Sequence, residues 1–319
     1  MFASLAITNR CNMRCKMCDV GQKNESASGL MRNWNSSKEL NPDEWAMIME
    51  ALKVSHIHIL GVEPLLYDKF DLLLEKIHDG RNIKLTTNGF MMHRYIDAIN
   101  KYCNSVMVSI DGLKDTHDKI RGVSGSFHRA FEGVLKLKEL GKRVGISFAI
   151  TPDNVSEMYD VHRFFGKYGV KVLFNHYNYI HPDCCVDFEC KPSNNGYDIL
   201  DIDVDELYAQ INKIGNGKFY PRLDKHQLKK WYGIVPCNFF RKKCMVLEDM
   251  ASGNRCSIAS DGRFIMPERC WFTAKDLGMP SEGIHGLTNS LDLDNIIKYI
   301  ESKGLPSPCQ RLCCAGVCL

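Results

Sequence analysis

Short apolar runs alternate with amphipathic stretches over the first half of the chain. The runs are five to eight residues long and read as strands. They are residues 2–8, 56–60, 83–87, 105–110, 144–150 and 170–177. The stretches between them place apolar residues at helical spacing, and they predict helices at 42–53, 67–80 and 126–142, among others.

This alternation predicts an α/β fold with parallel strands and right-handed crossovers. A barrel or partial barrel and an open doubly wound sheet both fit the pattern. No GxGxxG sequence follows the first strand, which counts against a dinucleotide-binding sheet. In a barrel, functional groups gather at the C-terminal ends of the strands.

The regular alternation stops near residue 178. Residues 179–236 are polar, with one predicted helix at 203–214, and we interpret them as a connecting region that partly covers the barrel mouth. Residues 237–319 contain short strands around a turn at Asp261-Gly262, then a helix near 292–303. We therefore expect three parts: 1–178, 179–236 and 237–319.

Composition narrows the class of protein only a little. Hydrophobic residues make up 45% of the chain, charged residues 25%, and the net charge is +3. No basic patch alternates with aromatic residues, so we expect no nucleic-acid partner. The first residues do not form a signal peptide and no run of about 18 apolar residues exists, so we expect a cytoplasmic protein with no membrane partner.

The 15 cysteines change this picture. In a reducing compartment such a number indicates metal or redox chemistry rather than disulfides. Three lie near the N-terminus, three lie in 184–190 and six lie between Cys256 and the C-terminal end, whereas residues 19–102 have none. Buried structural thiols would be spread more evenly.

Cys11, Cys15 and Cys18 follow the first predicted strand in one short loop. Their spacing lets the loop place three thiolates around a cuboidal [4Fe–4S] cluster and leaves one iron without a protein ligand. A zinc site needs a fourth nearby ligand, and the loop contains no histidine. Purely structural cysteines are the alternative.

This CxxxCxxC loop resembles that of the radical S-adenosylmethionine (SAM) superfamily, and further motifs follow in the same order. Gly61-Val62-Glu63-Pro64 resembles the family's GGEP motif, and Thr87-Asn88-Gly89 its TNG element. Ser109-Ile110-Asp111-Gly112, followed by Arg121-Gly122 and Gly125-Ser126-Phe127, resembles its SxDG…RG…GSF run. The match covers roughly residues 3–178.

The resemblance implies a partial (β/α)6 TIM-like barrel that binds SAM over the cluster. Glu63 and the backbone around it would hold the amino group of the methionine moiety, and Ser109 and Arg121 would contact its carboxylate or the ribose. The implied SAM-binding residues are Met17, Gly61, Glu63, Pro64, Thr87, Asn88, Ser109, Asp111 and Arg121. A reducing partner such as flavodoxin or ferredoxin would supply one electron, and a 5′-deoxyadenosyl radical would then abstract a substrate hydrogen.

Two positions depart from the family pattern. Met17 stands where the family usually has an aromatic residue that packs on adenine, and a thioether can pack on a ring as well. Val62 replaces the second glycine of GGEP, which restricts close backbone approach there. Neither change removes a ligand.

The C-terminal cysteines resemble the twitch and SPASM extensions of this superfamily, which carry auxiliary [4Fe–4S] clusters. Cys256 and Cys270 flank the predicted hairpin, and the resemblance implies one auxiliary cluster held by these two and two more cysteines. The further candidates are Cys309, Cys313, Cys314 and Cys318. Cys237 and Cys244 are candidates for completing a second cluster, and a zinc ribbon is the alternative to both.

We therefore expect a radical SAM oxidoreductase of the dehydrogenase type, acting on a small molecule such as a sugar or cyclitol. Its auxiliary cluster would accept the electron left after hydrogen abstraction. The alternative is a peptide-modifying maturase that forms crosslinks or epimerises; an epimerase needs a thiol hydrogen donor, with Cys237 and the 184–190 cysteines as candidates. A non-catalytic electron carrier or redox sensor would not need the SAM motifs.

Overall fold

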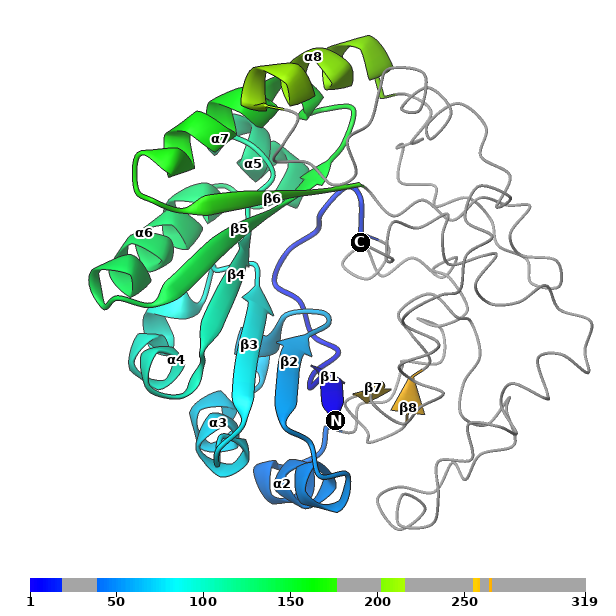
Figure 1. Ribbon diagram of the computed structural model, residues 1–319, viewed down its shortest axis with the longest axis vertical. Helices are drawn as coiled ribbons and strands as arrows, with labels where there is room; N and C mark the ends of the chain where they lie inside the picture. The colour runs from blue at the N-terminus through cyan, green and yellow to red at the C-terminus, as the bar shows by residue number, and fades with distance from the viewer. Residues whose placement is uncertain (19–38, 177–201, 216–254, 259–263, 266–319) are drawn as a thin grey trace, which may run out of the picture.

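A computed structural model describes residues 1–18, 39–176, 202–215, 255–258 and 264–265 of the chain. Six parallel strands follow one another in both sequence and space (Figure 1). They are β1 (Phe2–Ala6), β2 (His56–Leu60), β3 (Asn82–Thr87), β4 (Ser105–Ser109), β5 (Arg143–Ile150) and β6 (Lys171–His176). All six predicted strands are confirmed, with ends shifted by no more than two residues.

The strand order distinguishes between the two architectures left open by the sequence. The order β6-β5-β4-β3-β2-β1 never reverses, whereas a doubly wound sheet reverses at a switch point. Helices cover the outer, convex face of the curved sheet, as in a partial barrel (Figure 1). They are α2 (Pro42–Ala51), α3 (Phe70–Ile77), α4 (Ile96–Tyr102), α5 (Lys114–Arg121), α6 (Ser126–Glu139) and α7 (Met158–Gly166).

Local sequence explains where these helices begin. Asn41 caps α2, because its side chain accepts hydrogen bonds from the backbone N–H groups of Asp43 and Glu44, and the Glu44 carboxylate accepts one from the N–H of Asn41. Pro42 occupies the first helical position, where its missing N–H costs nothing. At α6, the carboxylate of Asp118 accepts hydrogen bonds from Gly125 N, Ser126 Oγ and Phe127 N at 2.6–2.8 Å.

One continuous core lies between the sheet and the helices. Strand residues alternate along each strand, so that Ile57, Ile83, Val106 and Ile146 are fully buried toward the helices. Trp45, on α2, is among the largest buried side chains of this core. Burial of this face holds each strand in register. The loop that follows each strand is thereby positioned at the C-terminal edge of the sheet.

Two parts of the later chain join this barrel. Helix α8 (Val204–Ile214), at the predicted position, packs beside α7, and Gln210 bridges them by accepting from Tyr159 N (2.9 Å) and donating to Ser156 O (2.8 Å). This helix of the predicted connecting region therefore extends the outer layer (Figure 1). Strand β7 (Arg255–Ile258) pairs in parallel with β1, and β8 (Phe264–Ile265) pairs antiparallel with β7.

The β7–β8 pairing matches the predicted hairpin, although its pairing with β1 was not expected. The predicted helix near 292–303 lies outside the described residues. The division at 178/179 and 236/237 stays a prediction. No helix in the described ranges has the length and apolar content needed to cross a membrane.

Candidate functional site

The cysteine loop leaves the C-terminal end of β1 and runs over the end of α5. Arg14 N donates to Arg121 O (3.1 Å), and Lys16 N donates to Ile120 O (2.9 Å). Gly122 makes this close approach possible: its φ is +70°, and a Cβ there would lie 2.8 Å from Arg14 O. Arg121 and Gly122, the RG pair of the sequence motif, therefore form the surface on which the cysteine loop packs.

The thiols of this loop differ in environment. Cys11 is exposed, Cys15 is buried and Cys18 is intermediate. Burial raises the pKa of Cys15 to about 12, and the positive charge of Arg121 opposes that rise. The pKa of Cys11 is also raised, because nearby protein atoms partly desolvate its thiol although the residue lies at the surface. The charges of Cys11 and Cys18 each raise the pKa of Cys15 further, as expected for three thiols carried by one short loop.

This donor set fits a [4Fe–4S] cluster. Three thiols from one loop lie within electrostatic reach of one another beside a cationic side chain, which favours the thiolate form that iron requires. Binding iron would displace the protons that the raised pKa values retain on Cys11 and Cys15. Within the described ranges, no three His, Cys, Asp or Glu side chains are placed to hold a single metal ion.

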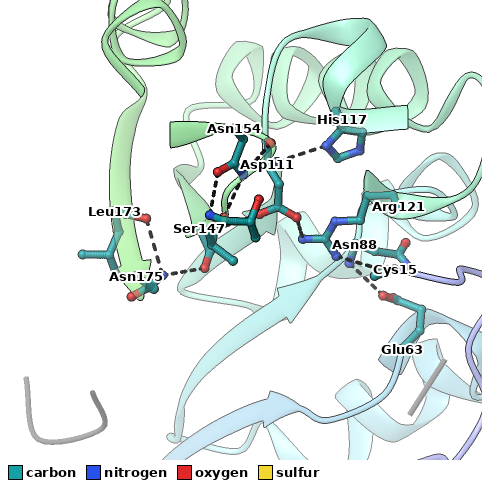
Figure 2. A network of polar contacts seen from close by, with 12 residues as sticks. Cys15, Glu63, Asn88, Asp111, His117, Arg121, Ser147, Asn154, Leu173 and Asn175 are labelled. Atoms are coloured by element: carbon teal, nitrogen blue, oxygen red, sulfur yellow. Dashed lines mark hydrogen bonds and ion pairs between the residues drawn. The ribbon is translucent and has the colours of Figure 1, made fainter. Parts of the chain in front are cut away.

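Glu63 lies at the end of β2 and is 1% exposed. Its Oε1 accepts from Thr87 Oγ1 (2.6 Å) and Leu65 N (3.1 Å), and its Oε2 accepts from Asn88 N (2.7 Å). Burial raises the pKa of Glu63, and these three hydrogen bonds oppose the rise. The carboxylate thereby joins the end of β2 to the end of β3 (Figure 2).

The same two loops are tied to the cysteine loop. Glu63 N donates to Arg10 O (3.1 Å), next to Cys11, and Asn88 Nδ2 donates to Asn12 Oδ1 (2.8 Å). Gly61, with φ +116°, packs so closely on β1 that an added Cβ would lie 2.8 Å from the Cβ of Ala6. Pro64 is buried and begins the short helix η1 (Pro64–Leu66).

Asp111 and Arg121 form a buried ion pair beside Cys15 (Figure 2). Arg121 Nη2 lies 2.5 Å from Asp111 Oδ2, and Arg121 Nη1 donates to Cys15 Sγ at 3.7 Å. Burial alone would lower the pKa of Arg121, but the negative charge of Asp111 raises it, so the guanidinium stays charged. Asp111 Oδ1 accepts from Ala149 N (2.8 Å), which fixes it against β5.

The remaining predicted residues lie on β4, in the cysteine loop or on β7, or fall outside the described residues. Ser109 is the last residue of β4, half-buried and opposite Ser147 of β5. Met17 is half-buried within the cysteine loop. Cys256 lies on β7, opposite Ala3 of β1. The other C-terminal candidates lie outside the described residues: Cys237, Cys244, Cys270, Cys309, Cys313, Cys314 and Cys318.

Three residues of the site were not predicted. Asn12 lies inside the cysteine loop itself. Asn154 donates from Nδ2 to Asp111 O (2.9 Å) and Ala149 O (2.8 Å), and His117 Nδ1 accepts from Asp111 N (3.1 Å). Asn154 follows β5 in a Thr-Pro-Asp-Asn turn, so its place after a strand was a usable signal.

Comparisons with known proteins agree with this architecture. Residues 5–165 match the model of the Radical SAM superfamily. The GTP 3′,8-cyclase of Aquifex aeolicus (strain VF5) is 25% identical over 309 residues, which cover 93% of this chain and 87% of the cyclase. The sporulation killing factor maturation protein SkfB of Bacillus subtilis (strain 168) is 29% identical over 164 residues, 50% of this chain and 38% of SkfB.

Solved structures show the same fold. SuiB of Streptococcus suis, bound to its precursor peptide SuiA, superposes with a TM-score of 0.58 at 15% identity, over 92% of this chain and 63% of SuiB. The chain thus spans less than two thirds of SuiB. Native anSMEcpe with bound AdoMet superposes with a TM-score of 0.58 at 16% identity, over 93% of this chain and 83% of that one. With a family model that spans half of its length, this chain belongs to the radical SAM superfamily.

Proposed function

We propose that this chain holds a [4Fe–4S] cluster on Cys11, Cys15 and Cys18 and binds SAM at the ends of β2, β3 and β4. One observation carries the proposal: the loops after β2 and β3 are hydrogen-bonded to the cysteine loop through Glu63 and Asn88, and Arg121, on the helix that follows β4, contacts the Cys15 thiol. When bound, the reduced cluster and SAM supply a 5′-deoxyadenosyl radical that abstracts a substrate hydrogen.

The protein's own groups have separate tasks in this proposal. Glu63 offers a buried carboxylate for the methionine amino group, and Thr87 and Asn88 keep that carboxylate in one orientation. Arg121 holds a positive charge at Cys15, and Asp111 keeps that charge in place. Ser109 presents a hydroxyl at the end of β4, and Met17 offers a thioether near the cysteines.

For the substrate, we propose a peptide, the alternative considered from the sequence. The expectation of a sugar or cyclitol dehydrogenase receives no support from the relatives reported above, which are a cyclase and a maturation protein. SkfB is named as a maturation protein, and SuiB was solved with a precursor peptide. An electron donor such as flavodoxin or ferredoxin would reduce the cluster.

We also propose an auxiliary [4Fe–4S] cluster on Cys256, Cys270 and two of Cys309, Cys313, Cys314 and Cys318. The pairing of β7 with β1 supports it, because β1 leads directly into the N-terminal cysteine loop while β7 carries Cys256. The three-part division at residues 178/179 and 236/237 belongs to this proposal. Cys237 is the proposed thiol hydrogen donor if the reaction is an epimerisation.

A second candidate function is cyclisation of a purine nucleotide. It is favoured by the length of the match to the Aquifex GTP 3′,8-cyclase, which extends through the C-terminal third of this chain. The two candidates predict different substrates for the same radical chemistry.

The test is reductive cleavage of SAM by the anaerobically reconstituted full chain. Wild type with dithionite should release 5′-deoxyadenosine, and the Cys11→Ala/Cys15→Ala/Cys18→Ala variant should release none. Cys103→Ala is the matched control, because it removes a buried thiol far along the sequence from the loop. Release by the triple variant would overturn the proposal, and conversion of added GTP would favour the nucleotide candidate.

A separate measurement tests the auxiliary cluster. Cys256→Ala with Cys270→Ala should lower iron content by about one cluster, because two of its ligands are lost. The variant should still cleave SAM but form little product. Full iron content would show that these two cysteines are not ligands.

A further inference from the structure

The concave face of the sheet carries a row of polar side chains in one register. Ser4 lies opposite His58, His58 opposite Lys84, Lys84 opposite Ser105, and Ser105 opposite Arg143. We call these five residues the basal row. Their neighbours along each strand point toward the helices and are buried, so the basal row faces away from the core.

Lys84 and Arg143 are two strands apart in this row, on either side of Ser105. Neighbouring strands are about 4.8 Å apart, so their backbones are separated by about 10 Å and their long side chains can reach one group between them. The positive charge of Arg143 contributes to a lowered pKa of Lys84, after burial, which is the larger cause. The two cations therefore share one electrostatic environment.

Within the described part of the chain, neither cation has an anionic partner. Lys84 is half-buried and Arg143 is exposed, whereas the half-buried Arg81 and Lys16 pair with Glu50 and Asp153. His58, in the same row, forms a hydrogen bond through Nε2 to Thr86 Oγ1 at 2.8 Å. For the half-buried Lys84, the lack of a counter-ion costs free energy, and an anion that enters would recover it.

Between the basal row and the strand ends, the concave face carries first an apolar contact and then polar side chains. In the next concave row, the thioether of Met107 covers Gly145, where an added Cβ would lie 2.9 Å from Met107 Sδ. Two residues further, Ser109 lies opposite Ser147, and Asn175 Nδ2 donates to Ser147 Oγ at 2.9 Å (Figure 2). Ser109 lies four positions beyond Ser105, about 13 Å along the strand.

We propose that Lys84 and Arg143 bind an anionic group of the substrate, a carboxylate or a phosphate, on the concave face of the barrel. The inference rests on the proposed function, because it places the reacting carbon at the strand ends, about 13 Å from the anion. An extended peptide covers that distance in about four residues. Arg143 supplies a planar fork for two oxygens and Lys84 a point charge.

The test is isothermal titration calorimetry of the full chain at low ionic strength, with two probes. Tetraglutamate represents a peptide carboxylate source and inorganic tripolyphosphate a phosphate source. Wild type should bind at least one probe, and Lys84→Met and Arg143→Met should each weaken that binding at least tenfold. Lys84→Arg should keep it within a few fold, because the charge remains.

Lys167→Met is the matched control, since it removes one exposed positive charge at the end of α7, on the helical side. It should bind the probe within twofold of wild type. Thermal unfolding provides a second readout: the probe should raise the melting temperature of wild type and Lys167→Met but not of Lys84→Met. This comparison also establishes that each variant is folded.

Two outcomes would overturn the inference. One is equal affinity in wild type, Lys84→Met and Arg143→Met, and the other is no binding of either probe by wild type. Failure of the proposed function is a different result, because it appears as no 5′-deoxyadenosine release by wild type in the absence of any probe.

Discussion

Arg121 Nη2 lies 2.5 Å from Asp111 Oδ2, and this buried ion pair joins the last residue of α5 to the loop after β4. The same guanidinium contacts Cys15 Sγ, so one side chain connects the SxD motif to the cysteine loop. The sequence resemblance assigned Arg121 to SAM. In the structure its guanidinium lies between a carboxylate and a cysteine, which gives it a part in holding the cysteine loop.

Removing one partner of this pair should strongly destabilise the fold. Asp111→Asn leaves a buried guanidinium without its counter-ion, and we expect a loss of about 3–5 kcal/mol in the free energy of unfolding. Arg121→Met leaves a buried carboxylate and should cost a similar amount. The double variant should cost clearly less than the sum of the two. Urea unfolding of the four proteins measures this, and strictly additive losses would show that the pair is not coupled.

Glu63→Gln should weaken SAM binding on the order of 1.5–3 kcal/mol, because it removes the charge that we propose faces the methionine amino group. Glu132→Gln is the control, since Glu132 is partly exposed on α6 and pairs with His128. Equilibrium binding of SAM to both variants is the measurement. Equal affinities for SAM would show that Glu63 serves only to join the ends of β2 and β3.

Gly122→Ala should prevent the cysteine loop from closing on α5. An alanine Cβ would lie 2.8 Å from Arg14 O, and the residue would also have to keep a φ of +70°. Gly125→Ala is a matched control with a φ of +77° but no atom within 4 Å of the added Cβ. We expect reconstituted iron to fall in Gly122→Ala and to stay near wild type in Gly125→Ala. Equal iron content in both would refute this role of Gly122.

The stability of the barrel should depend on pH through His117. Burial lowers the pKa of His117 to about 3, so the folded chain keeps it neutral where the unfolded chain protonates it. The unfolded state binds more protons between about pH 6.5 and 3, and stability is therefore lost as pH falls through that range. One such group contributes at most about 1.4 kcal/mol per pH unit.

His117→Gln should flatten this dependence, because glutamine retains an acceptor for Asp111 N and does not titrate. The measurement is the free energy of unfolding from pH 7 to pH 4 for wild type and variant. His128→Gln, which alters an exposed histidine on α6, should retain the wild-type slope. Identical slopes for wild type and His117→Gln would assign the pH dependence to other groups.

The strands of the barrel and most of the candidate site were readable from sequence, for local reasons. Alternation in Ile57–Ile59 or Val106–Val108 reports which face of a strand is buried, and parallel strands bring the residues that follow them to one edge. Glu63, Asn88 and Asp111 each follow a strand, so their gathering near the cysteines followed from topology alone. Helix α8 was likewise visible from its Asp203 cap and its helical spacing.

Other features were decided only by the tertiary structure. Alternating strands and helices are compatible with a barrel or with a doubly wound sheet, and only the unbroken strand order distinguishes them. The partners of Arg121, the burial of His117 and the pairing of β7 with β1 join residues far apart in the chain, and local pattern carries no information about such contacts. Sequence spacing therefore determined which groups stand at the strand ends, whereas packing of the strands and helices determined which of those groups touch.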